Sequence, residues 1–576
     1  MNQEIAKILF EMAMLLEMKE VPFKPRAYEK AALTIESLEQ DVKEIYKLGG
    51  LKALMDIPGI GQGIAEKIEE FIKTKRVKDF ESLKRQVPVD VSGLTSIEGL
   101  GPKSVYKLYK KLGIKTISQL EKAAKAGKLR DLEGFGQKSE EKILKGIEFL
   151  SLNQGRFVLG FIWPEINSIL EKLRALPYVE RAEPAGSIRR MQETVGDLDI
   201  LAISREPEKV MDYFVSMPEV SHVYGKGPTK ANVRLKNGMD ADLRVLESKS
   251  FGAALQYFTG DKYHNIALRE IAIKKGYKLN EYGLFRSLAS RSLRSKASGA
   301  RTEEEIYEAL GMEWIPPEIR TNSGELEAAK EGKLPKLIEY GSLKGDLQVQ
   351  TNWTDGANSI KEMAEAAKKI GLEYIVITDH TRSLAMTGGL DEKKLLKQMI
   401  EIDKVQKEVS GVKILKGAEV NILKDGRLDI SNEVLAKLDV AGGAVHSNFN
   451  LSEKEQIQRI VRAMENPNID VIFHPTGRII QKREPYKVDI EALIKAARRT
   501  KTILEIDAYP SRLDLKDHHI RKAVEAGVKL AIDSDSHSIS HFQYLELGVA
   551  QARRGWAEAK DVINNRPYKE MLKLLK

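Results

Sequence analysis

The stretch GSIRRMQETVGDLDILAIS, residues 186–204, limits what this chain can fold into more than any other part of it. Asp197 and Asp199 lie two residues apart at the start of an apolar run, so on a β-strand both project to the same face. A second strand pattern, MDADLRVL, can bring Asp242 beside them, with Asp240 as the competing candidate. Three adjacent carboxylates repel one another unless cations lie between them, as in sites that hold two Mg²⁺ or Mn²⁺ ions for phosphoryl transfer. The stretch therefore predicts an α/β domain with a two-metal site.

Polar groups just ahead of these aspartates suit a triphosphate. Gly186 and Ser187 offer backbone and hydroxyl donors, and Arg190 offers a charged fork. The spacing of the whole stretch resembles the nucleotidyltransferase signature of the family X DNA polymerases, of which polymerase beta is the familiar member. The resemblance implies a polymerase palm and adds Gly196 to the nucleotide-binding residues. Met191 departs from the pattern, because the family often has a smaller or different residue there.

The segment FGAALQYFTGDKYHN resembles the nucleotide-binding segment of the same family. The resemblance implies that Tyr257 and Phe258 press against the sugar and disfavour a 2′ hydroxyl. It places Gly260 beside the nucleotide and Asn265 in the minor groove of the nascent base pair. Asp261 is a departure from polymerase beta, which has serine there, and an added negative charge near a triphosphate is expected to weaken nucleotide binding.

A repeated pattern fills the first 150 residues, in the copies IPGIGQGIAEKI, IEGLGPKSVYKL and LEGFGQKSEEKI. Each copy places Gly-x-Gly between two helical patterns, where a tight turn brings backbone N–H groups and a helix N-terminus toward a phosphate. The pattern resembles the helix-hairpin-helix motifs of DNA-repair proteins and implies DNA binding without reading of bases. The predicted contacts are Gly59, Gly61, Gly99, Gly101, Gly134 and Gly136.

The first copy also resembles the amino-terminal lyase domain of the family X polymerases, through FKPRAYEKAA and AEKIEEF. By that resemblance Lys67 matches the Schiff-base lysine, while Lys24 and Tyr28 line its pocket. A lysine attacks the aldehyde of an abasic sugar only as a free amine, so its pKa must be lowered by burial or by neighbouring cations. Gly63 replaces a second pocket lysine of the family. The alternative is that Lys67 is an ordinary solvated helix residue.

Short apolar runs in the last 240 residues repeatedly end in a potential metal ligand. Functional groups at the carboxyl ends of successive parallel strands converge on one face of a βα barrel. Their order resembles the polymerase and histidinol phosphatase (PHP) domain of prokaryotic family X polymerases, a distorted (βα)₇ barrel whose trinuclear Mn²⁺ or Zn²⁺ site hydrolyses phosphate esters, often at DNA 3′ ends. The ligands implied are Asp355, His380, Glu419, His446, His474, Asp535 and His537.

The opening His-x-His of the PHP family is absent here, because Gln348 and Gln350 occupy both positions. Neutral amide oxygens are poor substitutes for imidazole at Mn²⁺ or Zn²⁺, so one of the three ions is left mainly with Glu419 and Asp535. Asp507 is expected to compensate by adding a carboxylate on the same rim. Two interpretations remain open, a weakened 3′–5′ exonuclease and a structural or DNA-gripping relic.

Composition limits the compartment and the partners expected for this chain. The chain has no cysteine, which excludes disulfides, thiolate zinc sites and cysteine nucleophiles and fits a reducing, cytoplasmic compartment. No apolar run is long enough for a membrane span. The formal charge of +9 permits an anionic partner, and the basic segment 261–301 is expected to contact the DNA backbone.

Together these patterns predict a multidomain chain. We expect a lyase-type helical domain at 1–90, a helix-hairpin-helix region at 91–150, a palm with nucleotide-binding subdomain at 151–317, a polar linker at 318–340 and a PHP domain at 341–576. The expected function is template-directed filling of short gaps in base excision repair by a monomer that binds gapped or nicked DNA and deoxynucleoside triphosphates. The alternatives are a template-independent nucleotidyltransferase and a DNA-end-binding scaffold with an inactive PHP domain.

Overall fold

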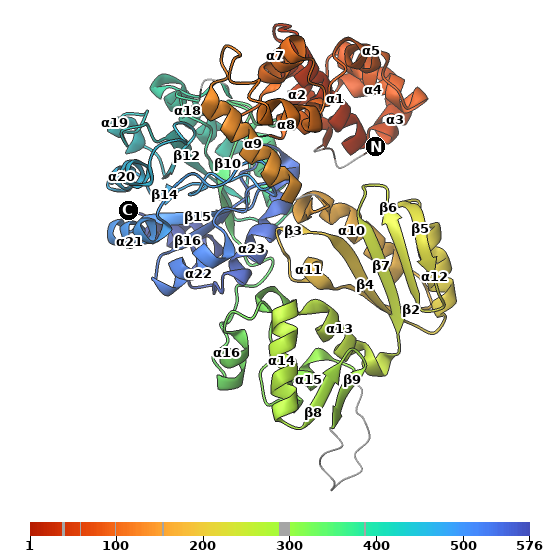
Figure 1. Cartoon of the computed structure of the whole chain (residues 1–576). Helices are drawn as coiled ribbons and strands as arrows, with labels where there is room; N and C mark the ends of the chain where they lie inside the picture. Colours follow the sequence, from red (N-terminus) through yellow and green to blue (C-terminus); the bar gives the residue numbers. More distant parts are fainter. Residues whose placement is uncertain are drawn as a thin grey trace.

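The computed structural model describes residues 1–36, 38, 41–57, 59–97, 99–152, 155–286, 300–384 and 387–576 (Figure 1). The N-terminal helices lie beside the C-terminal barrel in the view of Figure 1. The palm and the nucleotide-binding subdomain that follows it, which we call the thumb, lie below them. Part of the basic segment predicted to contact the DNA backbone, residues 287–299, lies outside the described part. Among the described residues we find no helix with the length and hydrophobicity of a membrane span.

The N-terminal region consists of short amphipathic helices around two apolar cores. The helices are α1 (Asn2–Met18), α2 (Lys24–Glu36), α3 (Val42–Met55), α4 (Gln62–Thr74), α5 (Lys78–Gln86), α6 (Val91–Thr95), α7 (Pro102–Leu112), α8 (Ile117–Lys125) and α9 (Gln137–Leu152). Helix α1 buries Leu9 and Met12 in the first core, and Leu15 and Met18 in the second. One helix therefore joins both helix-hairpin-helix units.

The palm is a five-stranded sheet in the order β2-β4-β7-β6-β5, in which β4 and β7 are parallel. Its elements are α10 (Leu159–Arg174), β2 (Val179–Pro184), α11 (Gly186–Arg189), β4 (Asp197–Ser204), α12 (Pro207–Ser216), β5 (Val220–Lys226), β6 (Lys230–Leu235) and β7 (Asp240–Leu246), with the small pair β1 (Phe157–Val158) and β3 (Thr194–Val195). Because side chains alternate along β4, Leu198 and Ile200 enter the core with α10 and α12. Asp197 and Asp199 consequently lie on the opposite face.

The thumb follows the palm and extends further than expected. It contains α13 (Phe251–Thr259), α14 (Lys262–Lys274), β8 (Tyr277–Asn280), β9 (Gly283–Arg286), α15 (Glu303–Ala309) and α16 (Glu325–Glu331). The segment 318–340, predicted as a polar linker, is instead folded: Leu326 and Leu337 enter the thumb core, and Arg320 is fully buried in an ion pair with Glu303. The prediction of a linker was wrong because the segment contributes apolar residues to the core and because its charged residue Arg320 is paired inside the protein.

The C-terminal region is a seven-stranded parallel barrel in the order β10 to β16, as predicted. Its strands are β10 (Gly345–Val349), β11 (Tyr374–Ile377), β12 (Lys413–Asn421), β13 (Val440–Ala444), β14 (Val471–Ile472), β15 (Ile503–Asp507) and β16 (Leu530–Asp533), and its longer helices are α17 (Ile360–Lys369), α18 (Glu392–Glu408), α20 (Glu453–Met464), α21 (Ile490–Thr500), α22 (Asp517–Glu525) and α23 (Leu545–Arg554). The ring closes just after the carboxyl ends of β10 and β16, where the backbone N–H of Gln350 donates to the Ser536 carbonyl at 2.7 Å. Asn564 also bridges β10 and β16, through its side chain.

The palm and the barrel share a polar interface. Arg478 of the barrel forms a two-pronged ion pair with Glu193 of the palm, at 2.6 and 3.1 Å, and Gln551 donates to the same carboxylate. Met191 contacts an apolar barrel cluster that includes Leu547 and Tyr544. This contact explains the unusual residue at position 191, since a methionine there attaches the palm loop to the barrel.

Candidate active sites

The predicted palm triad assembles on one face of the sheet. In the parallel pairing of β4 with β7, Asp199 lies opposite Asp242, and Asp197 lies opposite Asp240. Arg234 of β6 binds the Asp240 carboxylate with two bonds of 2.8 and 3.0 Å. Asp240, the competing candidate for the third position, is therefore already paired, and Asp242 completes the triad.

Electrostatics around the triad fit a cation site. Burial, together with the charges of Asp197 and Asp242, raises the pKa of Asp199 to about 6. Lys230 lies 3.4 Å from Asp242 and Asn232 donates a hydrogen bond to it, so the third carboxylate is held in place. Three oxygen ligands whose mutual repulsion raises a pKa are the donor set that Mg²⁺ or Mn²⁺ prefers.

Gly186 brings backbone directly against the triad. Its φ of +60° is in the left-handed region, and a Cβ there would lie 2.9 Å from Asp199 Oδ2. The preceding residue, Ala185, donates its N–H to the Asp199 carbonyl at 2.8 Å. Position 186 therefore requires glycine, and the start of α11 is fixed next to the carboxylates, where a triphosphate would approach.

The other predicted triphosphate residues are positioned less tightly. Ser187 is half-buried at the start of α11. Arg190 donates from Nη1 to the Thr259 carbonyl at 2.7 Å, while its buried Nε has no hydrogen-bond partner among the described residues. A Cβ added to Gly196 would meet nothing within 4 Å in the part of the chain that the structure describes. Arg190 is thus held against the Thr259 carbonyl with an unsatisfied, buried Nε, whereas no steric constraint from the described residues requires glycine at 196.

The Tyr257–Gly260 turn is held from behind by Asn265. The amide of Asn265 donates to the carbonyls of Tyr257 at 2.7 Å and Gly260 at 3.1 Å, so in this structure it supports the turn. The Tyr257 and Phe258 rings meet edge to face at 5.2 Å. Asp261 caps α14 by accepting the His264 N–H at 2.7 Å, which gives the departure from serine a structural reason.

The three glycine hairpins have the same geometry. The first glycine of each has a positive φ, +79° at Gly59, +88° at Gly99 and +85° at Gly134. An N–H to C=O bond of 2.8–3.0 Å closes each turn between Ile57 and Ile60, Ile97 and Leu100, and Leu132 and Phe135. Around Gly61, Gly101 and Gly136 a Cβ would meet no described atom within 4 Å. The second glycines are therefore open to a backbone phosphate.

Lys67 does not have the environment that a lyase nucleophile needs. Partial burial lowers the pKa of Lys67, but Asp79, 2.9 Å from its Nζ, and the Tyr28 hydroxyl offset that effect and leave the pKa raised. Its Nζ also donates to the Gly63 carbonyl at 3.1 Å. Lys24 is exposed on the same helix as Tyr28. The ammonium form of Lys67 is thus favoured, whereas a lyase nucleophile must be a free amine.

The barrel rim brings most of its predicted ligands around Glu419. One carboxylate oxygen of Glu419 lies 2.8 Å from His474 Nε2 and 3.0 Å from His446 Nε2, and the other lies 2.9 Å from His380 Nδ1. Although burial alone would raise it, His380 and His446 hold the pKa of Glu419 well below its usual range. Asn421, which sequence reasoning missed, fixes His446 through a 2.8 Å contact with its Nδ1. A buried carboxylate shared by three imidazoles is suited to a bridging metal ligand.

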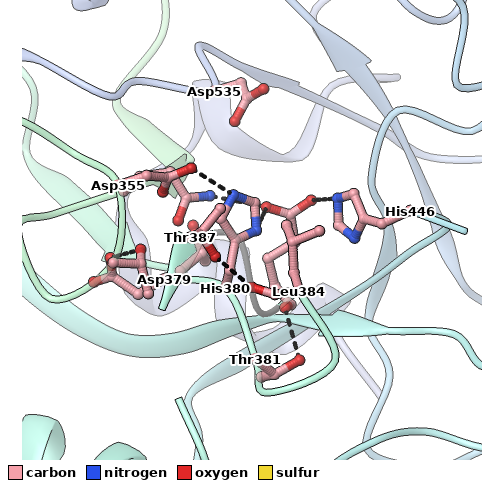
Figure 2. Close-up of polar contacts among 12 residues, drawn as sticks. Asp355, Asp379, His380, Thr381, Leu384, Thr387, His446 and Asp535 are labelled. Atoms are coloured by element: carbon pink, nitrogen blue, oxygen red, sulfur yellow. Dashed lines mark hydrogen bonds and ion pairs between the residues drawn. The ribbon is translucent and has the colours of Figure 1, made fainter. Parts of the chain in front are cut away.

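A second ligand group adjoins the first through His380. Asp355 Oδ2 lies 3.4 Å from His380 Nε2 and 3.7 Å from His537 Nε2. Figure 2 shows His380 between Asp355 and His446, with Asp535 above them in this view. Among the described residues, Asp355–His380–His537 and His380–Glu419–His446 are the groups whose donor atoms lie close enough together to hold a cation. These nitrogen and oxygen donors fit Mn²⁺ or Zn²⁺.

Protein side chains occupy the place where the family resemblance implies a third metal ion. Gln350 donates its amide to Glu419 at 2.9 Å, and both polar atoms of the buried Gln348 amide have no partner among the described residues. The guanidinium Nε of Arg512 lies 3.3 Å from Asp507 and 3.5 Å from Asp535. A protein cation therefore lies between the carboxylates, and Asp507 binds it instead of compensating for the histidines. Sequence reasoning missed Arg512, although it follows Asp507 by five residues.

The arrangement defines a class of protein: a nucleotidyltransferase palm with DNA-binding hairpins and a thumb, joined to a histidine-rich phosphoesterase barrel. Family models agree in the same order along the chain. They match a helix-hairpin-helix domain at 1–77, a SAM-like helix-hairpin-helix tandem at 91–148, a DNA polymerase beta thumb at 254–321 and a PHP domain at 346–565.

Comparison with characterised proteins identifies the family. The DNA polymerase/3′-5′ exonuclease PolX of Bacillus subtilis (strain 168) is 38% identical, with 100% of this chain and 99% of that protein covered. A probable phosphatase of Thermoanaerobacter sp. (strain X514) is 34% identical over 31% of this chain and 73% of its own length. The chain belongs to the PolX branch of the family X DNA polymerases, with a C-terminal PHP domain.

Proposed function

We propose that this chain is a DNA-directed DNA polymerase that fills short gaps during base excision repair. The observation that carries the proposal is the register that places Asp199 opposite Asp242, with the Gly186 backbone against them. Its partners are gapped or nicked DNA and deoxynucleoside triphosphates, and one chain carries every part, so a monomer suffices. Three open glycine hairpins supply DNA binding without reading bases.

Each palm residue then has a defined task. Two Mg²⁺ or Mn²⁺ ions, when bound, would activate the primer 3′ hydroxyl and neutralise the triphosphate. Asp197, Asp199 and Asp242 would hold these ions, and the start of α11 at Gly186 offers backbone donors to the phosphates. Arg190 adds a charged donor whose Nε has no partner among the described residues. Asn265 keeps the turn that carries the sugar-contacting rings in position.

We also propose that the barrel removes nucleotides from DNA 3′ ends as a 3′–5′ exonuclease, with Mn²⁺ or Zn²⁺ in two positions and not three. The two ligand groups around His380 support the two positions, and Arg512 between Asp507 and Asp535 stands in place of the third cation. The charge of the bound ions would lower the pKa of an attacking water. His380 is the residue common to the two groups, and three imidazoles converge on Glu419 within the second.

One assay tests both activities. A 5′-labelled primer in a gapped duplex is incubated with Mg²⁺ or Mn²⁺, with and without the four deoxynucleotides. Extension that follows the template supports the polymerase, while template-blind tailing would favour a terminal transferase and no extension a DNA-end-binding scaffold. Shortening without nucleotides that disappears in His446→Ala supports the exonuclease. An intact primer in those lanes would assign the barrel a structural role.

The palm's dependence on Mg²⁺ is expected to change with pH. The raised pKa of Asp199, about 6, means that a proton competes with the cation below that pH. About half of the Asp199 carboxyl is ionised at pH 6 and about a tenth at pH 5, so the Mg²⁺ concentration for half-maximal extension should rise about fivefold between these pH values. The measurement is a Mg²⁺ titration of extension in the Glu419→Gln background, where the barrel site is disabled. A requirement that stays constant over this range would contradict the assignment.

Lyase activity is expected to be weak until Asp79 is removed. Because the Asp79 carboxylate raises the pKa of Lys67, Asp79→Asn should increase the free amine at neutral pH by up to about tenfold. Borohydride trapping of an abasic-site oligonucleotide measures this, with Lys67→Ala as the blank. Glu69→Gln, which removes the carboxylate 2.9 Å from Lys73 on the same helix, is the matched control and should change nothing. Strong trapping in the unmodified protein would contradict this expectation.

A further inference from the structure

The short helix α11 of the palm ends in a strained turn. The Gln192 N–H donates to the Ser187 carbonyl at 3.0 Å, and the Met191 N–H donates to the Ile188 carbonyl at 2.9 Å. These two bonds form a Schellman motif, in which glycine usually occupies the position of Met191 because a Cβ is disfavoured in the left-handed region. Met191 nevertheless has a φ of +50°. The turn therefore needs support from elsewhere in the protein.

The barrel supports this turn at the carbonyl and at the side chain of Met191. Arg554 of α23 donates from Nη1 to the Met191 carbonyl at 3.0 Å, and its almost fully buried guanidinium is also paired with Asp517 of α22. The Met191 side chain packs into the barrel cluster that contains Leu547 and Tyr544. The barrel thus holds the residue whose backbone conformation is the least favourable in the loop.

A second anchor lies two residues further on, at Glu193. Its carboxylate accepts hydrogen bonds from Arg478 and Gln551 of the barrel at 2.6–3.1 Å. Burial opposes the charge, but Arg478 and Arg554 hold the pKa of Glu193 below its usual value, so the carboxylate is ionised at neutral pH. On the palm side, the Glu193 carbonyl accepts the Leu159 N–H at 3.0 Å. Glu193 therefore joins the palm to the barrel.

The two anchored residues lie between groups that the polymerase site needs. Arg190, predicted to bind the triphosphate, directly precedes Met191, and Asp197 follows Glu193 by four residues. The backbone donors at Gly186 begin the same four-residue helix. A helix of one turn is not stable by itself, so the turn at Met191 decides how Arg190 and the start of the helix are placed.

We propose that Arg554 and Arg478 of the barrel are positioning residues of the polymerase site, which place α11 and Arg190 for the triphosphate by holding Met191 and Glu193. The inference rests on the proposed polymerase function and adds a second role for the barrel. In that role the barrel supports nucleotide binding without touching the nucleotide.

Single-nucleotide incorporation by the full chain tests the positioning role. Arg554→Gln should raise the KM for the deoxynucleoside triphosphate about tenfold, the effect of losing one charged hydrogen bond, with kcat little changed. If Arg554 only stabilised the fold, its loss would reduce the active fraction, and so kcat, at constant KM, and that result would overturn the proposal. Arg459→Gln is the matched control and should leave KM unchanged. Arg459 is buried in the barrel and donates to the barrel carbonyls of Leu423 and Ser447 at 3.0 and 2.9 Å.

The strained turn allows a second kinetic test. Glycine adopts a positive φ without strain, so in the Met191→Gly background the turn should form without the arginine, and Arg554→Gln should then raise KM by less than about twofold. A tenfold increase in both backgrounds would show that Arg554 does not act through the turn, and would overturn the proposal.

Hydrogen exchange tests the placement without polymerase activity. In the full chain without DNA or nucleotide, the amides of residues 188–196 should exchange about tenfold faster in Arg554→Gln and in Arg478→Gln than in the unmodified protein, as measured by mass spectrometry. Unaltered exchange, or an equal change in Arg459→Gln, would overturn the proposal. This readout stands even if the unmodified protein extends no primer, the outcome that would refute the polymerase alone.

Discussion

Replacing Asp199 with asparagine is expected to lower template-directed extension by about 10³-fold or more. The carboxylate lies opposite Asp242 and contributes one of three charges to the predicted cation site. Loss of metal charge stabilisation amounts to several kcal/mol in the transition state, and each 1.4 kcal/mol is about tenfold in rate. Single-nucleotide incorporation under single-turnover conditions measures the loss.

The palm offers a matched control for this substitution. Asp240→Asn removes a carboxylate from the same face of the adjacent strand, but Asp240 is already paired with Arg234. The Asp240→Asn variant should extend primers at close to the wild-type rate. Asp199→Asn should also leave exonuclease activity intact, because the barrel ligands are a separate set. A loss of comparable size in both variants would mean that the effect is structural and would refute the triad.

Restoring two histidines to the barrel is expected to strengthen the nuclease by about ten- to a hundredfold, the range by which metal-site environments change affinity or activity. In Gln348→His/Gln350→His, imidazoles replace an amide that now donates to Glu419 and one that has no described partner. Arg512 would then compete with a third ion for Asp507 and Asp535. Bound Mn²⁺ per chain, measured after dialysis by elemental analysis, should rise by one.

The control must change histidine content without changing the site. Gln86→His/Gln119→His adds the same two residues at exposed positions in the N-terminal region, away from the glycine hairpins, and should leave both metal content and shortening rate unaltered. If the barrel double variant gains no ion while the unmodified chain already binds three there, Arg512 does not replace a cation and the two-ion proposal fails.

The local sequence determined those features whose geometry follows from the spacing of residues along a strand or within a turn. Alternation along a strand fixes Asp197 and Asp199 on one face, and the Gly-x-Gly turns reproduce the same positive φ three times. Ligands at strand ends converge because parallel strands share an edge, which is why His380, Glu419 and His446 were found from the sequence.

Tertiary structure alone decided the matters that depend on partners distant along the chain or on neighbouring strands. Arg234 withdraws Asp240 from the triad, Asp79 raises the pKa of Lys67, and burial of Arg320 against Glu303 folds the expected linker into the thumb. Arg512 lies between Asp507 and Asp535, so the carboxylate expected to bind metal binds a guanidinium. Spacing fixes the direction in which a side chain points, but the charge that it meets there depends on how the whole chain packs.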